Sequence, residues 1–595
     1  ARDSICWNAL ITGYTQQGHD QEALNCFKQM ENEGLPPNGV TYLSILKACA
    51  NMGAIEKGTR FHDEIVNRGF LKDVAIGNAL IDMYGKCGLL AKAQEVFDGL
   101  PTKDVISWNA LIVGYAKHGH GEEALSCLGK MTHEGVSPNA FTYVSSLKAC
   151  ISIGAIQKVR ELHDEVIKKG LLERDVLVSN ALIDMYGKSG SLVDARQVFD
   201  TVPFRDVVSW TALMDGYTRH LYPEEALNCF EHMKFEGFSP TVVTYICSLN
   251  ACGMAQDIEK GCQIHADIEE KGILASDIEV GNAVIEMYIK CGLLTKAKEV
   301  LLKFPVRNTI SWNAMIIGYV IQKDNAEALE SFDEMQHDGI VPNPVTFAYV
   351  LKACGSIRAI DEGREVHAMI VQEGLLESHL ILGNSLVYMY TKCGFFKEAQ
   401  EVVNEICARD VASWTAIIAG YAEYDQAEEA LKCFDVMTDD GMCPSVITYS
   451  CILKACSSTG NIDKGMEIHA EIARKCMLEK DLIIGNALVD MYSKCGSLSK
   501  AKEAFDKLLV RDAISWNILI FGYTMHDHGK EALMCFEQMQ REGVSLTTFT
   551  YVSVLKACGI SLDTEKGKEI HSQVTRKGLL ETDDLVGNML VDMYG

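Results

Sequence analysis

One long repeat, marked by tryptophan, runs through the whole chain. Its copies follow one another at steps of 101 or 102 residues, and they contain every tryptophan of the protein: Trp7, Trp108, Trp210, Trp312, Trp414 and Trp516. A fixed period of this kind indicates a repeat architecture, in which each copy packs on the next without a separate core. The period therefore overrides the length of 595 residues, which by itself would suggest about four globular domains.

Each copy divides into three segments of unequal length. In the second copy these are residues 105–139, 140–175 and 176–206, which contain 35, 36 and 31 residues. No segment sustains the polar and apolar alternation of a strand, and no long linker interrupts the pattern. The chain is therefore predicted to be all-α, a solenoid of helical hairpins.

Apolar spacing places the two helices of a segment. The face that begins at Trp108 and ends at Tyr115 has apolar residues at i, i+3, i+4 and i+7, and the HGHG sequence after it is expected to break the helix. A second helix is predicted from Glu122 to Met131. In the 31-residue segment before it, the same spacing predicts a face made of Ala93, Val96, Phe97 and Leu100.

Composition and chain ends bound the class of protein. The chain is 48% apolar and 23% charged, which is typical of an ordered soluble protein. No run of about 18 apolar residues occurs, so no membrane span is expected. The first residues, ARD, match the end of a segment, and the last, NMLVDMYG, stop inside one. We expect a piece of a longer protein whose targeting peptide would lie upstream.

The 22 cysteines recur at equivalent helical positions. One set follows alanine in LKAC or LNAC: Cys49, Cys150, Cys252, Cys354, Cys456 and Cys558. Because equivalent residues lie one copy apart, they are too distant to form disulfides with one another. We interpret the cysteines as small buried apolar residues in a reducing compartment.

The sequence motifs resemble those of a known repeat family. SWNALI-x-GY marks the 35-residue segments, TY-x-x-x-LKAC the 36-residue segments and GNALIDMY-x-KCG the 31-residue segments, whereas the Trp-x-x-Leu-Gly-x-x-Tyr pattern of tetratricopeptide repeats is absent. These motifs resemble pentatricopeptide repeat proteins of the plant organellar PLS class, with P, L and S units over essentially the whole chain. The resemblance implies a right-handed superhelical α-solenoid of helix-turn-helix motifs.

The resemblance sets the unit boundaries. The P units are 4–38, 105–139, 207–241, 309–343, 411–445 and 513–547; the L units are 39–73, 140–175, 242–277, 344–379, 446–481 and 548–583; the S units are 74–104, 176–206, 278–308, 380–410, 482–512 and the truncated 584–595. The first L unit is one residue shorter than the others.

The resemblance also implies a function. Family members bind single-stranded organellar RNA with about one nucleotide per repeat, a mode in which two or three side chains specify each base. The PLS class mostly specifies sites of cytidine-to-uridine editing in mitochondria or chloroplasts. A deaminase domain is then expected downstream in the full protein or on a partner, and accessory editing factors are expected to bind the L units. No cofactor and no membrane partner are expected.

Two positions in each unit are predicted to contact a base. The first, here called the recognition residue, follows the aromatic of SWN or the glycine of GN: Asn8, Asn109, Thr211, Asn313, Thr415 and Asn517 in P units, and Asn78, Asn180, Asn282, Asn384, Asn486 and Asn588 in S units. The second, here called the terminal residue, ends the unit: Asn38, Asn139, Thr241, Asn343, Ser445 and Thr547 in P units, and Asp104, Asp206, Asn308, Asp410 and Asp512 in S units. An asparagine amide offers a donor and an acceptor to a Watson–Crick edge, and threonine offers a hydroxyl.

The family's code turns these pairs into a target. Asn with Asp suggests uridine, Asn with Asn suggests a pyrimidine, and Thr at the first position suggests a purine. L units are mostly apolar there, with Leu43, Val144, Ile246, Ala348, Ser450 and Val552, and are interpreted as spacers or partner-binding units. The predicted RNA is Y-x-U-Y-x-U-R-x-Y-Y-x-U-R-x-U-Y-x-Y, and the Thr211/Thr241 and Thr415/Ser445 pairs leave the choice of purine open.

Structural alternatives exist for these positions. An asparagine after an aromatic could instead cap or order the first helix, although the apolar L-unit residues argue against this. The second residue of each unit is mostly β-branched, as in Ile106, Val208, Ile310 and Ile514; the family uses it to sandwich bases, and the alternative is ordinary packing. The lysines of Tyr-x-Lys-Cys-Gly and its variants could contact phosphates or simply solvate a helix end: Lys86, Lys188, Lys290, Lys392 and Lys494.

The net charge of −26 excludes global phosphate neutralisation as the source of affinity. Acids gather in second-helix sequences such as GHGEEAL and DEIV, so the inner face of a solenoid could still be neutral to basic. We expect a weaker salt dependence than that of a basic RNA-binding protein.

No catalytic site is predicted. One histidine recurs in each L unit: His62, His163, His265, His367, His469 and His571. Three of them form His-x-Glu, but the Cys-x-x-Cys that would complete a zinc-deaminase site is absent from the sequence. We expect a structural role for these histidines.

The competing functions are RNA processing or stabilisation, and a scaffold that binds peptides in its groove.

Overall fold

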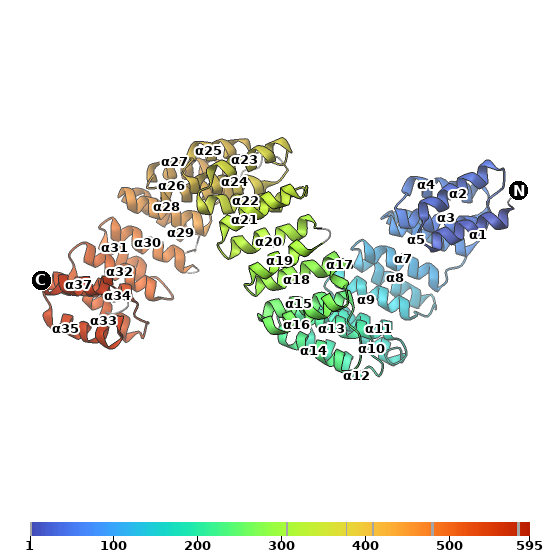
Figure 1. Ribbon diagram of the computed structural model, residues 1–595, viewed down its shortest axis with the longest axis horizontal. Coiled ribbons are helices and arrows are strands. Elements are labelled where there is room, and N and C mark those ends of the chain that lie inside the picture. The colour runs from blue at the N-terminus through green and yellow to red at the C-terminus, as the bar shows by residue number, and fades with distance from the viewer. Residues whose placement is uncertain are drawn as a thin grey trace. The chain divides into compact units, whose positions relative to one another are not determined.

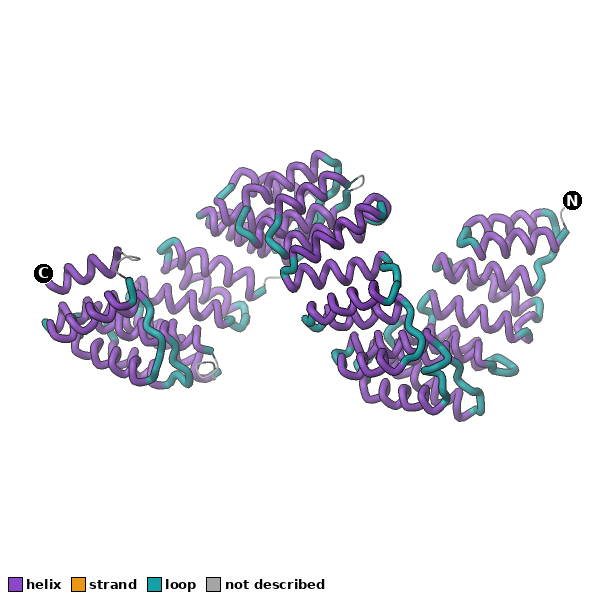
Figure 2. The backbone as a smooth tube through the Cα atoms, turned by 60° about the horizontal axis from the view of Figure 1, so that its bottom comes forward, coloured by secondary structure: helices purple, strands orange, loops and turns teal. Residues whose placement is uncertain are grey.

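Pairs of helices, stacked one after another, make up the protein. The computed structural model describes residues 3–304, 307–376, 378–406, 410–475, 477, 481–579 and 584–595, and within these ranges every regular element is a helix. The chain forms two compact blocks, residues 1–306 and 307–595, and each is a stack of helical hairpins (Figures 1 and 2). The all-α solenoid predicted from the repeat is confirmed.

The first helices of the units begin at the unit starts. In P units they are α1 (Ser4–Gln16), α7 (Val105–Lys117), α13 (Val207–Arg219), α20 (Thr309–Ile321), α26 (Val411–Glu423) and α32 (Ala513–Met525). In L units they are α3 (Gly39–Met52), α9 (Ala140–Ser152), α15 (Val242–Ala255), α22 (Pro344–Ile357), α28 (Val446–Thr459) and α34 (Thr548–Ser561). In S units they are α5 (Val74–Lys86), α11 (Val176–Lys188), α18 (Ile278–Lys290), α24 (Leu380–Cys393), α30 (Leu482–Lys494) and α37 (Asp584–Tyr594).

The second helices distinguish the unit types. In P units they are α2 (Asp20–Asn32), α8 (Gly121–His133), α14 (Pro223–Phe235), α21 (Asn325–His337), α27 (Ala427–Asp439) and α33 (Gly529–Arg541), and in L units α4 (Ile55–Asn67), α10 (Ile156–Lys168), α16 (Ile258–Glu270), α23 (Ile360–Gln372), α29 (Ile462–Arg474) and α35 (Thr564–Arg576). In S units they are only 9 or 10 residues long: α6 (Leu90–Asp98), α12 (Leu192–Thr201), α19 (Leu294–Lys303), α25 (Phe396–Glu405) and α31 (Leu498–Asp506). Short helices η1 (Phe70–Lys72) and α17 (Ile273–Ser276) end two L units. Across the described ranges no helix has both the length and the apolar character to cross a bilayer.

The terminal residue of one unit caps the first helix of the next. Asp104 precedes α7, and its carboxylate accepts from the amide of Ser107 at 2.8 Å. The Asp104 amide in turn donates to Ser107 Oγ at 3.2 Å, which completes a capping box. Such a box satisfies two backbone donors that a helix start would otherwise leave unpaired. The same residue types therefore fix where each hairpin begins.

The repeat tryptophans form the core between S and P units. Trp108 is 2% exposed and its ring meets Phe97 of α6 edge-on, with centroids 4.6 Å apart. Trp210 makes the same contact with Phe199 at 4.5 Å. Edge-to-face packing of large rings adds to the apolar area that they bury. Trp108 and Trp210 therefore each join a P unit to the S unit before it.

Consecutive first helices approach closely at a glycine pair. A Cβ atom on Gly114 of α7 would lie 3.0 Å from the Cα of Gly85 on α5, and the same crossing recurs at Gly216 and Gly187, where the distance is 2.8 Å. Side chains at these positions would push the helices apart. The close crossing keeps the first helices side by side, so that they form one continuous face within a block.

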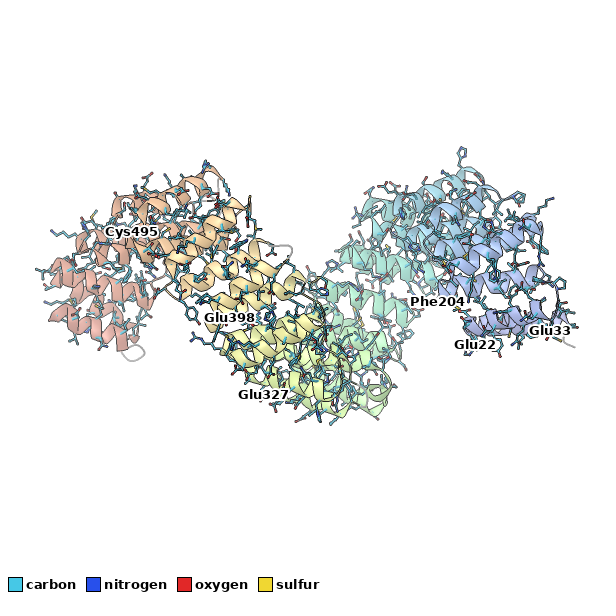
Figure 3. The ribbon with its side chains drawn as sticks, turned by 90° about the horizontal axis from the view of Figure 1, so that it is seen from above. Glu22, Glu33, Phe204, Glu327, Glu398 and Cys495 are labelled. Carbon is cyan, nitrogen blue, oxygen red and sulfur yellow. The ribbon has the colours of Figure 1, made fainter. Side chains whose placement is uncertain are left out.

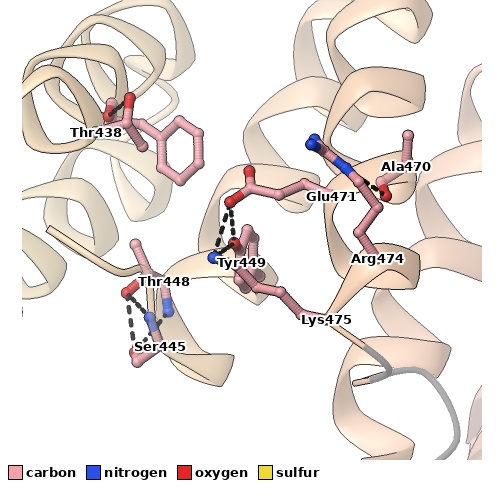
Figure 4. A network of polar contacts seen from close by, with 9 residues as sticks. Thr438, Ser445, Thr448, Tyr449, Ala470, Glu471, Arg474 and Lys475 are labelled. Carbon is pink, nitrogen blue, oxygen red and sulfur yellow. Dashed lines mark hydrogen bonds and ion pairs between the residues drawn. The ribbon is translucent and has the colours of Figure 1, made fainter. Parts of the chain in front are cut away.

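In an L unit, a polar network joins the first helix to the second. Figure 4 shows Tyr449 donating to Glu471 at 2.7 Å and Lys475 donating to the Tyr449 hydroxyl at 2.9 Å, next to the Ser445–Thr448 capping box. Glu22 and Glu327, labelled in Figure 3, lie on the second helices α2 and α21. Second helices therefore carry acidic side chains at the surface, as the sequence predicted.

Two local predictions need correction. Helix α8 begins at Gly121 and ends at His133, one residue before and two residues after the predicted bounds of Glu122 and Met131. The turn between α7 and α8 is short, because Gly119 adopts φ +80° and α8 begins two residues later. Leu100 lies beyond the end of α6 at Asp98, and it is buried because its side chain fills the space over Gly77, which has no side chain.

Candidate functional site

The recognition and terminal residues of a unit meet directly. In unit 176–206, Asn180 donates from Nδ2 to Oδ1 of Asp206 at 3.0 Å. Ser209, the third residue of α13, donates from Oγ to Asn180 Oδ1 at 2.6 Å. The same hydroxyl and the Ser209 amide also donate to Asp206 Oδ1. Positions far apart in sequence therefore form one polar cluster between adjacent hairpins.

The cluster recurs along the chain. In unit 105–139, Thr142 donates to Asn109 Oδ1 at 2.7 Å, and Asn109 Nδ2 donates to Asn139 Oδ1 at 3.4 Å. The other direct pairs are Asn8–Asn38 at 3.1 Å, Asn78–Asp104 at 3.1 Å, Asn313–Asn343 at 3.1 Å, Asn384–Asp410 at 3.3 Å and Asn517–Thr547 at 3.0 Å. Within the described residues no hydrogen bond joins Asn486 to Asp512, and the terminal residue that would follow Asn588 lies beyond the chain.

The two threonine units have a different cluster. Thr211 donates to the Val207 carbonyl of its own helix at 2.7 Å and shares a hydrogen bond with Thr244 at 2.9 Å. Thr244 also contacts Thr241, so the recognition and terminal residues are connected through it. Thr415 contacts the Val411 carbonyl and Thr448 in the same way, and Ser445 contacts Thr448.

Sequence reasoning missed the third member of the cluster. The Ser or Thr at the third position of the following first helix is buried, and in several units it contacts both predicted positions, as Ser209 does. Of the two predicted positions, Ser107 contacts only the terminal residue, Asp104, in the described structure. The signal was present in the recurring SW and TY motifs, where that residue precedes the aromatic. The capping role that the structural alternative gave to the recognition residue belongs instead to the terminal residue, which lies one residue before the next helix.

Open cavities run along the first helices beside these clusters. A cavity of about 840 Å³ is lined by Asn139, Asn180 and Thr211 among others, and one of about 650 Å³ is lined by Asn78 and Asn109. Most recognition residues are only 7 to 9% exposed. Asn78, Asn109 and Asn180 therefore reach a cavity with a small part of their surface while hydrogen bonds hold their amides.

Exposed apolar side chains flank the recognition residues. The second residue of the unit is large and apolar in most units, and it is between 46 and 75% exposed: Ile5, Val40, Ile106, Phe141, Leu177, Val208, Val243, Ile310, Val345, Ile381, Ile447, Ile483, Ile514, Phe549 and Leu585. Ordinary packing within the protein does not account for this exposure. These exposed second residues offer apolar contact surface beside the polar clusters.

Hydrogen bonding sets the charge of two terminal carboxylates. Burial raises the pKa of Asp104, but hydrogen bonds from Ser107 and Asn78 outweigh it and hold that pKa below its ordinary value. The pKa of Asp410 is lowered in the same way by Ser413 and Asn384. Both groups are therefore ionised and act only as acceptors at neutral pH.

Comparison with known proteins decides the family. The family model described as PPR repeat family matches residues 2–51, 103–152, 205–274, 307–356, 409–458 and 511–559, and the model described as PPR repeat matches 40–70, 78–105, 178–203, 384–411, 447–477 and 486–512. The chain belongs to the pentatricopeptide repeat family.

Curated pentatricopeptide repeat-containing proteins of Arabidopsis thaliana match along nearly the whole chain. One is 32% identical over 592 residues, which are 99% of this chain and 70% of the relative. A mitochondrial one is 32% identical over 97% of this chain and 75% of its own length, and a chloroplastic one is 32% identical over 94% and 58%.

A solved structure has the same fold. The crystal structure of the pentatricopeptide repeat protein PPR10 in complex with an 18-nt psaJ RNA element superposes with a TM-score of 0.59 at 20% identity, covering 96% of this chain and 84% of that one. The pentatricopeptide solenoid is thus the fold of this chain.

The L units of this pentatricopeptide chain lack the polar cluster. Val144 and Ala348 occupy the recognition position and line cavities on the first helices. An aspartate that ends an L unit caps the following S helix through a shorter turn, as Asp175 does for the amide of Leu177 at 3.0 Å, whereas His379 makes no side-chain cap. Five of the six L units therefore have an apolar residue where P and S units have an amide or hydroxyl, and the fifth L unit has Ser450.

The S-unit lysines singled out in the sequence are ion-paired. Lys86 contacts Asp82 at 2.8 Å, one helical turn earlier on α5. Lys188, Lys290 and Lys494 pair in the same way with Asp184, Glu286 and Asp490, and Lys392 pairs with Glu423 of α26. Their charge is largely balanced within the protein, which weakens them as phosphate ligands.

The recurring L-unit histidines each meet a tyrosine of the following S unit. His163 Nδ1 lies 3.1 Å from the Tyr186 hydroxyl, and the other pairs are His62–Tyr84, His265–Tyr288, His367–Tyr390, His469–Tyr492 and His571–Tyr594. Burial lowers the pKa of His163 below its ordinary value. Among the described residues no group of three or more His, Cys, Asp or Glu could hold a metal ion. The histidines join consecutive units.

Within the described residues the cysteines are thiols rather than disulfides. The LKAC cysteines are buried, and burial raises the pKa of Cys49 to about 11. A protonated, inaccessible thiol acts as a small apolar residue.

Proposed function

We propose that this chain binds single-stranded RNA in a sequence-specific way, with one base at each P and S unit. The observation that carries the proposal is the cluster of recognition residue, terminal residue and bridging Ser or Thr, which opens onto the groove between exposed apolar side chains. PPR10, whose fold this chain shares, was solved with an RNA element, which supports RNA as the ligand.

The cluster explains how a base could be selected. Asn180 uses one N–H on Asp206 and one lone pair on Ser209, so its second N–H and second lone pair remain for a Watson–Crick edge. Because both partners fix the amide plane, little rotamer entropy is lost on binding. The exposed Leu177 and Val208 side chains, in consecutive units, would cover the two faces of the base.

The terminal residue would separate the pyrimidines. A carboxylate such as Asp206 is only an acceptor, so it favours uracil, whose N3–H is a donor, over cytosine, whose N3 is an acceptor. An amide such as Asn139 can donate or accept and tolerates both. The predicted target is therefore Y-x-U-Y-x-U-R-x-Y-Y-x-U-R-x-U-Y-x-Y, in which x faces an L unit.

We further propose that the P, L and S units form a PLS-class array that acts as a specificity factor for cytidine-to-uridine editing in a mitochondrion or chloroplast. The unit lengths of 35, 36 and 31 residues and the organellar names of two relatives support this. The array itself would bind rather than catalyse, and a deaminase in cis or in trans would act on the RNA. The apolar L-unit positions would serve as spacers or contact accessory factors.

A gel-shift titration tests the proposal. The predicted 18-nucleotide RNA should bind at least tenfold more tightly than a control in which every specified pyrimidine and purine is exchanged. The matched protein control carries Asn→Ala at Asn78, Asn109 and Asn180, which leaves the capping residues in place. Equal affinity of the wild-type chain for both RNAs would contradict base recognition.

A further inference from the structure

A second row of residues follows the recognition position on the L-unit helices. On α9, Lys148 lies four residues after Val144, so both side chains occupy the same helix face and line the same cavity. Lysine stands at the equivalent position in five L units, and each is exposed: Lys47, Lys148, Lys352, Lys454 and Lys556. The third L unit has Asn250 there.

These lysines differ from the S-unit lysines in having no acidic partner. Among the described residues, none of the five makes an ion pair within 4.0 Å, whereas Lys188 is 2.7 Å from Asp184 and Lys494 is 2.7 Å from Asp490. The only ring near them is that of Tyr349, whose centroid lies 6.0 Å from Lys352 Nζ in the described structure. Their ammonium groups are thus open to a ligand from the groove.

Two of these lysines line cavities, Lys148 in block 1–306 and Lys352 in block 307–595. The cavity that contains Lys148 also contains two i,i+4 ion pairs, Lys188–Asp184 and Arg219–Asp215, at 2.7 and 2.6 Å. Its remaining carboxylate, Asp175, caps α11. In block 307–595, the cavity of about 430 Å³ that contains Lys352 is lined by no carboxylate within the described residues. The cavity that contains Lys352 is therefore a local positive site on a chain whose net charge is −26, whereas three cations and three carboxylates line the cavity that contains Lys148.

The same position has a different character in the other unit types. One turn after the recognition residue, most S units carry an acid that is paired with their own lysine, as at Asp82 and Lys86, whereas the fourth S unit has Tyr388. P units carry mostly neutral residues there, such as Val113 and Ile317. At this position a lysine without an acidic partner therefore occurs in five of the six L units, within the described part of the chain.

We propose that these five lysines bind the phosphates of the RNA, so that L units anchor the backbone while P and S units select bases. This inference rests on the proposed function. An ammonium group is a point charge suited to phosphate contact, and such contacts position a nucleic acid without specifying its sequence. The lysines would supply phosphate affinity that the acidic chain cannot supply globally.

Salt dependence tests the inference. Replacing all five lysines with Gln should lower the slope of log K against log salt by roughly 0.7 per lost contact, about 3.5 in total, because each contact with a single strand releases counterions. Affinity for the predicted RNA and for its exchanged control should fall by the same factor. A control variant with Lys86, Lys188 and Lys494 replaced by Gln should change the slope much less, and Asn250→Lys should raise it by roughly 0.7.

The outcomes separate the two proposals. An unchanged slope in the five-lysine variant, with sequence discrimination intact, would overturn the phosphate role and leave base recognition standing. A loss of discrimination between the two RNAs would also overturn it, because it would place the lysines at the bases. Failure of the wild-type chain to bind either RNA would contradict the proposed function and this inference together. Circular dichroism of each variant ensures that the fold is retained.

Discussion

The Nδ2 atom of Asn180 lies 3.0 Å from the Asp206 Oδ1 atom that also caps helix α13. One carboxylate therefore orients the recognition residue of its own unit and begins the first helix of the next. Base selection and the stacking of hairpins thus depend on the same atoms, and substitutions at the terminal residue should affect both.

Exchanging the pair tests base selection at a single nucleotide. The double variant Asn180→Thr, Asp206→Asn should move the preference at the sixth nucleotide of the target from U towards A. Both residues fit without strain, because Thr211 occupies the recognition position and Asn139 the terminal position elsewhere in the block. Competition between RNAs that differ only at that nucleotide measures the change, expected to be about 1–3 kcal/mol in relative binding free energy.

An L-unit variant provides the control for this exchange. Val144→Ala removes apolar volume at the equivalent position but no hydrogen-bonding group. The preference at the facing nucleotide should stay flat before and after the substitution. A new base preference there would show that L units also select bases.

Removing a cap tests the second role of the terminal residue. Asp104→Ala deletes the acceptor for the Ser107 amide and should lower the free energy of unfolding by about 1 kcal/mol. Asp104→Asn keeps an acceptor, as Asn139 does before α9, and should keep most of the stability while it relaxes the preference for uridine. Urea denaturation distinguishes the two variants; equal destabilisation by both would mean that the negative charge, rather than the cap, matters.

The period and motifs were enough to predict an all-α solenoid of helical hairpins. Leu100 shows the limit: its apolar spacing placed it on the helix face, yet the helix ends at Asp98 and the side chain packs over Gly77 of the neighbouring helix. The bridging Ser209 was likewise not recognised, because its contact with Asn180 depends on how adjacent hairpins are aligned. Period and composition carry no direct information on that alignment.

The lysines of the first helices show the same limit for the prediction of ion pairs. Asp82 and Lys86 are spaced i,i+4, so their ion pair could have been read from the sequence. The lack of an acidic partner for Lys148 could not be predicted from the sequence. It depends on which acidic side chains of neighbouring helices lie near the lysine. The sequence motif alone therefore selected, as candidates for phosphate binding, the S-unit lysines that the structure shows in ion pairs.

Histidine burial predicts a loss of stability in mild acid. Burial lowers the pKa values of His62, His163, His265, His367 and His469 below the ordinary 6.5. A lowered pKa means that the folded state favours neutral imidazole, so this contribution to stability is present above pH 6.5 and is lost as the pH falls through the lowered values. The urea midpoint should therefore fall between about pH 7 and about pH 5.

A single substitution checks the source of this acid sensitivity. His163→Phe preserves a ring against Tyr186, whose centroid is 5.7 Å from that of the imidazole, but removes one titrating group. The variant should be less stable at neutral pH, because the tyrosine hydroxyl loses its partner, and its midpoint should depend less steeply on pH. An unaltered pH dependence would assign the effect to carboxylates instead.

Backbone strain at Leu221 offers a stabilising substitution. Leu221 adopts φ +65°, in the left-handed region, at the turn where the first two P units have Gly18 and Gly119. Its side chain is 76% exposed, so little packing is lost on removing it. Leu221→Gly should raise the free energy of unfolding by about 0.5–1 kcal/mol, since relief of the left-handed strain exceeds the entropy cost of glycine. Gly119→Ala is the reverse experiment: no atom lies within 4 Å of the added Cβ, so any destabilisation reports the backbone alone. Urea denaturation of both variants should give shifts of opposite sign, and a destabilised Leu221→Gly variant would show that the exposed leucine contributes more through packing than its backbone costs.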